Sequence, residues 1–119
     1  MATEYLYLNS RDEFLRLDVS QIVFFEADGN YTNIVLSNKL KGVVCMNLSQ
    51  MQNMISSQLK KKANNFARVG KSYIINMNYI YSIQILKQCL ILSDQHTFAF
   101  SLSISKEALK NLRDILIKQ

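Results

Sequence analysis

The chain of 119 residues contains no proline and only three glycines, Gly29, Gly42 and Gly70. Segments that link domains are usually rich in both residue types. No internal repeat or low-complexity tract divides the sequence either. We therefore expect residues 1–119 to form a single domain, which is long enough to bury a hydrophobic core without disulfides or metals.

Residues for common catalytic and metal sites are scarce. The single histidine, His96, lies in a predicted turn with only Asp94 near it in the sequence, so a histidine-based metal site or a catalytic triad has few parts. Gly70-Lys71-Ser72 resembles the end of a phosphate-binding P-loop, but the earlier glycine is missing and a strand follows instead of a helix. We expect no enzymatic activity, no cofactor and no metal, with His96 exposed in its turn.

Long hydrophobic runs and paired cysteines are also missing. No apolar run approaches the ~18 residues that suggest a membrane span, and the polar N-terminal residues do not form a signal peptide. Cys45 and Cys89 lie in apolar, strand-like segments without C-x-x-C spacing. The sequence predicts buried free thiols in a cytoplasmic protein with no membrane partner.

Positive charge is in excess and unevenly distributed. The formal net charge is +5, and no acidic residue occurs between Asp28 and Asp94, which favours a polyanionic partner. The run Lys60-Lys61-Lys62 could bind phosphate, but cations at the end of a helix also offset its dipole. We favour a solvated helix end for this run.

Strand patterns dominate the sequence. Turn-forming residues separate segments 5–8 and 13–17, and Asp28-Gly29-Asn30 separates 22–27 from 31–36, so both pairs are predicted hairpins. Further apolar segments predict strands at 41–46, 73–75, 80–86, 90–92 and 97–100. This gives about eight short strands in a sandwich-like or barrel-like domain.

Two segments have helical periodicity. Apolar residues recur at Leu48, Met51, Ile55 and Leu59, after Asn47 and Gln50 in capping-box positions. A second helix is predicted from about Lys106, with Ser105 as its cap and with an apolar stripe at Leu109, Leu112 and Leu116. The fold class is therefore mostly β with two short helices, a β-dominated α+β fold.

Two polar segments are candidate binding loops. Arg68, Lys71 and Ser72 precede a stiff apolar strand, an arrangement that suits contacts to phosphate oxygens. The alternative is that Arg68 pairs with a carboxylate and Lys71 is simply solvated. Upstream, the segment Asn30-Tyr31-Thr32-Asn33 offers amide and hydroxyl groups suited to base edges and phosphates; its alternative is an ordinary hairpin turn.

The order of these motifs resembles that of LytTR-type DNA-binding domains. Ile22 to Tyr31 is similar to the family's "I-x-[YF]-[IF]-E-A-x-G-N-Y", and Phe66 to Asn76 is similar to "F-x-R-[VI]-H-[RK]-S-[YF]-[IV]-[VI]-N". The helix led by Asn47 lies between them, Tyr79 to Ile83 matches "x-I-x-x-I", and the resemblance extends from about 22 to 118.

The resemblance implies a stack of small antiparallel sheets and a role in bacterial transcriptional regulation. Such domains bind double-stranded promoter DNA in pairs on repeated sites, with loops in the grooves, which makes a homodimer an expectation here. They are output domains of response regulators in two-component systems, so a receiver domain or a sensor kinase is an expected partner.

Carried over by position, the resemblance places three DNA-binding loops. The first is Asn30, Tyr31, Thr32 and Asn33, and the second is Arg68, Lys71 and Ser72. The third, which commonly carries "S-[RK]" before the last helix, falls near Ser103, Ser105 and Lys106. We expect Arg68 and Lys71 to hold the phosphate backbone while the first loop contacts bases.

Two positions depart from the family pattern. Gly70 stands in place of the usual histidine, and Ile104 follows Ser103 where an arginine is expected, although Lys106 could serve after a small register shift. These departures favour one alternative function. The same scaffold could be a protein-interaction module that modulates another regulator without contacting DNA.

Overall fold

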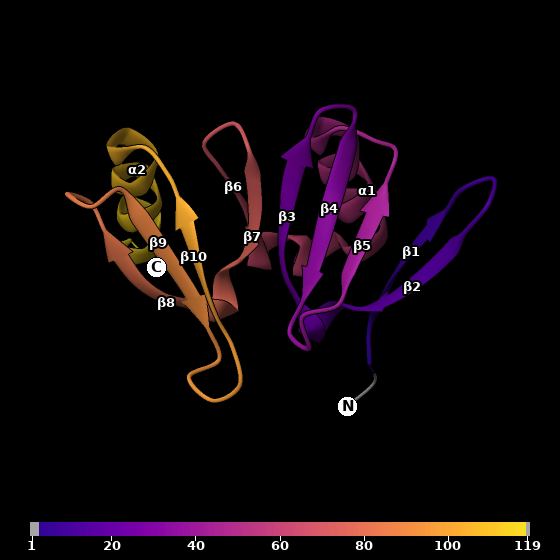
Figure 1. Ribbon diagram of the computed structural model, residues 1–119, viewed down its shortest axis with the longest axis horizontal. Coiled ribbons are helices and arrows are strands. Elements are labelled where there is room, and N and C mark those ends of the chain that lie inside the picture. Colours follow the sequence, from indigo (N-terminus) through magenta and orange to yellow (C-terminus); the bar gives the residue numbers. More distant parts are fainter. Residues whose placement is uncertain (1–2, 119) are drawn as a thin grey trace.

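Three small antiparallel sheets and two helices make up the fold, in a computed structural model that describes residues 3–118 (Figure 1). The first sheet pairs β1 (Tyr5–Asn9) with β2 (Phe14–Asp18). The second has the order β5-β4-β3-β7-β6, with bounds β3 (Ile22–Asp28), β4 (Tyr31–Leu36), β5 (Lys41–Val44), β6 (Phe66–Val69) and β7 (Tyr73–Asn76). The third has the order β10-β9-β8, with bounds β8 (Ile80–Gln84), β9 (Cys89–Ser93) and β10 (Ala99–Ser103).

The five-stranded sheet lies between two hydrophobic clusters. On one face, Phe25 and Ile74 pack with apolar residues of α1 (Leu48–Leu59) and of the β1–β2 hairpin. On the other face, Phe24 and Ile75 pack with the three-stranded sheet and with α2 (Lys106–Ile117). Successive side chains of a strand point to opposite faces, so β3 and β7 supply both clusters and form the centre of the molecule.

Local sequence signals explain both helices. The side chain of Asn47 accepts a 2.8 Å hydrogen bond from the backbone of Gln50, whose side chain accepts a 2.9 Å bond from the Asn47 backbone. This reciprocal pair satisfies two free N–H groups at the start of α1. The Ser105 hydroxyl caps α2 by accepting a 3.2 Å bond from the Ala108 amide. Both predicted helices and both predicted caps are confirmed.

The prediction of a β-dominated fold with small antiparallel sheets is confirmed, but individual strands differ from those expected. The segment Phe66–Val69 was not expected to be a strand, yet it forms β6 and pairs with β7. Conversely, Thr97 and Phe98 lie outside any strand because their amides donate to Asp94, so β10 begins only at Ala99. The strands form three separate sheets, which corrects the expectation of a sandwich or barrel.

Two further expectations concern the exposure of the cysteines and of His96. The cysteines are free, as predicted, but neither is buried: Cys45 is exposed and Cys89 is half-buried. Cys45 follows β5, which is an edge strand of its sheet. His96 is exposed in its turn, as expected. Within residues 3–118 no helix is long and apolar enough to cross a membrane.

Candidate nucleic-acid interface

The three predicted binding loops lie along one edge of the molecule. In Figure 1 the β3–β4 turn, the β6–β7 turn and the connection from β10 to α2 all lie at the top of the view. The start of α1 is at the same edge. Segments separated by up to about seventy positions are thus brought together, by antiparallel pairing within the five-stranded sheet and by the packing of that sheet against the three-stranded sheet and α2.

Hydrogen bonds fix the first two turns relative to one another. The backbone N–H of Ala27, close to the end of β3, donates a 2.8 Å bond to the carbonyl of Ser72 in the β6–β7 turn. Beside it, the Tyr73 hydroxyl donates a 3.3 Å bond to the Glu26 carboxylate. Burial raises the pKa of Tyr73, and the Glu26 charge raises it further, so the phenol keeps the proton that it donates.

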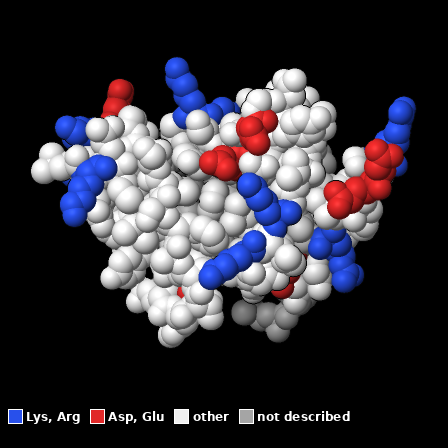
Figure 2. Space-filling model, viewed as in Figure 1, with Lys and Arg blue, Asp and Glu red and all other residues white. Residues whose placement is uncertain are grey.

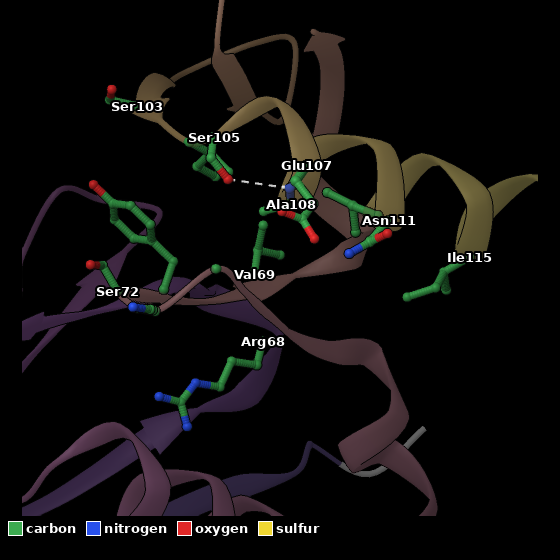
Figure 3. Close-up of a pocket in the computed structure, with 14 residues that line it drawn as sticks. Arg68, Val69, Ser72, Ser103, Ser105, Glu107, Ala108, Asn111 and Ile115 are labelled. Carbon is green, nitrogen blue, oxygen red and sulfur yellow. Dashed lines mark hydrogen bonds between the residues drawn. The ribbon is translucent and has the colours of Figure 1, made fainter.

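A cleft of about 590 Å³ separates the β6–β7 turn from α2 (Figure 3). Lys71 and Ser72 line one wall, and polar residues of the α2 side line the other: Ser103, Ser105, Glu107 and Asn111. Gly70 has φ +64°, and a Cβ built on it would lie 3.8 Å from the Ala108 Cβ. A side chain at position 70 would therefore contact the α2 wall of the cleft.

The two cations of the second loop face different surroundings. Lys71 is exposed within the turn itself. The Arg68 side chain points away from α2 (Figure 3), and its Nη1 donates a 3.1 Å bond to the Ser49 hydroxyl in the first turn of α1. Among residues 3–118, neither cation has a carboxylate within salt-bridge distance. The alternative of an Arg68–carboxylate pair is therefore wrong.

The first loop is smaller than the sequence predicted. Asn30 and Tyr31 are exposed, but Thr32 and Asn33 are 0% and 5% exposed. The Thr32 hydroxyl donates a 2.7 Å bond to the Met46 carbonyl, and the Asn33 amide nitrogen lies 3.5 Å from a carboxylate oxygen of Asp28. Both side chains belong to β4 and point inward, so they are not available to a base edge in this conformation. This corrects the predicted role of Thr32 and Asn33.

The residues of the third loop differ in exposure. Ser103, Ser105 and Lys106 are exposed, whereas Ile104 is only 5% exposed and packs in the second hydrophobic cluster. A cation at position 104 would have to be buried, which is costly without a partner. Lys106, and not the residue at position 104, is therefore the position after a serine at which a cation is exposed in this loop.

Two residues of the cleft were missed from the sequence. Glu107 and Asn111 extend from α2 toward the strand that carries Val69 (Figure 3). Together with Ile115 they recur at intervals of four, which places them on one face of the helix beside the buried Leu112. That spacing could have revealed a polar helix face next to the candidate loop.

Charge on the surface is mixed rather than gathered in one patch. Figure 2 shows Lys and Arg side chains spread over the visible face, with acidic side chains among them in its upper half. Glu26 and Asp28 come from β3, which ends next to the first turn. The segment between Asp28 and Asp94 lacks acidic residues, but the surface to which it contributes carries acidic side chains from other segments.

A mostly β scaffold that presents three polar loops along one edge defines a loop-based binding domain. The chain belongs to the LytTr DNA-binding domain family, which matches residues 12–117. The structure is similar to a solved LytTr DNA-binding domain from Bacillus cereus, described as part of a methyl-accepting/DNA response regulator, with a TM-score of 0.64 and 21% identity over 97% of this chain and 98% of that one. A search of curated proteins by sequence found no significant match.

Proposed function

We propose that this domain binds double-stranded promoter DNA in a sequence-specific manner and regulates bacterial transcription. The contacts come from the shared edge: Asn30 and Tyr31 in the first turn, Lys71 and Ser72 in the second, and Ser103, Ser105 and Lys106 in the third. The observation that supports this most strongly is the Ala27–Ser72 hydrogen bond, which holds two of these turns in a fixed relation.

Electrostatics supports DNA as the partner. Lys71 is exposed in the second loop and Lys106 in the third. Arg68 lies in β6, just before the second loop, and its guanidinium group is turned toward α1. Cations at loop tips can reach phosphates while neighbouring polar side chains contact base edges. With about two to three phosphates neutralised by these cations, affinity would fall roughly 10- to 40-fold between about 50 and 200 mM salt.

Family membership supports the wider role. We infer that two copies bind repeated sites in a promoter, and that a receiver domain or a sensor kinase controls the binding. A cytoplasmic location follows from this role.

Two residues, Gly70 and Ile104, suggested the alternative of a protein-interaction module, and the surroundings of both fit DNA binding equally well. Ile104 is a core residue, so its side chain does not stand where a base contact was lost. Gly70 adopts a positive φ that suits a tight turn, and its lack of a side chain keeps the cleft open. Neither residue is a reason to expect that DNA contacts are missing.

Selection of bound duplexes from a random pool tests the proposal most directly. The expected result is a recurrent motif whose affinity exceeds that of scrambled duplex, persists with competitor polyanion and falls with salt as stated above. Equal affinity for the selected and scrambled duplexes would contradict specific binding. No measurable duplex binding at low salt would contradict the proposal as a whole.

A further inference from the structure

Glu107 is an unexpected residue to find in a cleft that meets DNA. Among the described residues that line the cleft it is the one acid, alongside the cations Arg68 and Lys71. It is exposed, and within residues 3–118 its carboxylate has no hydrogen bond or ion pair. A carboxylate near a phosphate is repelled, so this part of the cleft is unsuited to the DNA backbone.

The position of Glu107 is fixed by α2. Ser105 caps the helix, and Glu107 is the acidic residue of its first turn, where a negative charge is favoured by the helix dipole. This turn faces the β6–β7 turn, since a Cβ added to Gly70 would lie at an ordinary contact distance, 3.8 Å, from the Ala108 Cβ. Lys71 lines the cleft from the β6–β7 turn and Glu107 lines it from α2, so one wall carries a donor and the other an acceptor.

A lysine donor next to a glutamate acceptor matches the hydrogen-bonding groups that one base pair presents in the major groove. In the major groove a G·C pair presents the acceptors O6 and N7 on guanine next to the N4 amino donor on cytosine. Lysine donates to guanine O6 and N7, and glutamate accepts from cytosine N4. An A·T pair presents its donors and acceptors in a different order. A C·G pair in the reversed orientation would place the cytosine amino group, a donor, opposite the lysine, which is also a donor.

We propose that the cleft recognises a single G·C pair, with Glu107 accepting from cytosine N4 and Lys71 donating to guanine. This inference rests on the proposed DNA binding and moves Lys71 from a phosphate contact to a base contact. Lys106, exposed outside the cleft, remains a phosphate contact. Glu107 is then a specificity-determining residue whose charge excludes both the backbone and the wrong base pair.

The test compares the motif selected by the wild-type domain with that selected by Glu107→Gln, followed by affinities for duplexes changed at one position at a time. The wild type is expected to prefer G·C at one position by roughly 5- to 150-fold, and Glu107→Gln to lose that preference. Lys71→Ala should lose preference at the same position. Asp114→Asn, an acid on α2 outside the cleft, is the matched control and should keep it.

Two results would overturn the inference while leaving DNA binding intact. Tighter binding of Glu107→Gln to every duplex with an unchanged motif would mean that the carboxylate only repels DNA. A uniform loss of affinity across sequences for Lys71→Ala would mark a phosphate contact instead. A wild-type domain that binds no duplex would overturn both the inference and the proposed function.

Discussion

The amide of Ala27 donates a 2.8 Å hydrogen bond to the carbonyl of Ser72, although the two residues are far apart in the sequence. This bond extends the pairing of β3 with β7 beyond the last paired residues, Glu26 and Tyr73. It ties the β6–β7 turn to the strand that leads into the β3–β4 turn. The spacing of Lys71 and Tyr31 is therefore set by the sheet rather than by flexible loops.

Reversing the charge of Lys71 should abolish duplex binding. Lys71→Glu places a carboxylate at the tip of the β6–β7 turn, where it would repel the DNA, and the residue is exposed, so folding should be unaffected. Fluorescence anisotropy with a labelled duplex measures the affinity, and circular dichroism checks the fold.

Lys61→Glu is the matched control, since Lys61 is exposed in the 3-10 turn Lys60–Asn65 that follows α1. It should lower affinity only slightly, through net charge. Equal losses for the two variants would show that overall charge, not the loop edge, governs binding.

Thr32 and Tyr31 should behave oppositely although they are neighbours. Thr32→Val leaves the part-buried Met46 carbonyl without its donor and should cost about 1 kcal/mol of unfolding free energy. Its affinity per folded molecule should not change. Tyr31→Ala removes a side chain that is 49% exposed at the edge and should weaken DNA binding with little loss of stability.

Chemical denaturation and duplex titration of both variants check this contrast. A Thr32→Val protein that is as stable as the wild type but binds poorly would return Thr32 to the DNA-contacting set.

Gly70 should resist substitution because of its backbone conformation. At φ +64° an alanine is strained, whereas the nearest atom to its new Cβ, at 3.8 Å, is at an ordinary contact distance. Gly70→Ala should therefore lose about 1–2 kcal/mol of stability, and Gly70→Asn should lose less because asparagine tolerates this region better. Thermal unfolding of the two variants measures the difference; an alanine variant of unchanged stability would contradict the turn geometry.

Asp94 should make stability depend on pH in the acid range. The Thr97 hydroxyl and the amides of His96, Thr97 and Phe98 hold the pKa of Asp94 well below its usual range. A depressed pKa in the folded state means that the carboxylate stabilises the fold above its unfolded pKa of about 3.9 and loses this effect as pH falls further.

Melting temperatures measured between about pH 2 and pH 7 should accordingly drop less steeply for Asp94→Asn than for the wild type. The variant should start from a lower value at neutral pH. Parallel curves for the two proteins would show that Asp94 does not contribute to the acid sensitivity.

Local sequence signals predicted much of the fold. Helix α1 follows from four apolar residues at helical spacing and from a reciprocal cap between Asn47 and Gln50, interactions that lie within a few residues of one another. The hairpin around Gly29 follows in the same way from a residue that tolerates positive φ. Such features do not depend on the rest of the chain.

Tertiary contacts decided what the sequence could not predict. Segment Phe66–Val69 looked like a loop because Arg68 interrupts its few apolar residues, and it becomes a strand by pairing with β7. Thr32 and Asn33 were expected to contact bases from the start of their strand, but the packing of β4 between β3 and β5 turns them inward. Glu107 drew no attention because its significance depends on Lys71, which is distant in sequence and meets it only across the cleft.

Mapping of backbone amide shifts by NMR, during titration with a selected duplex, tests the shared edge most directly. We predict that the largest changes cluster at residues 28–31, 70–72 and 103–107, and that residues 60–65 and 94–97 are unaffected. Changes centred on those last two segments, with the three turns silent, would contradict the proposed interface.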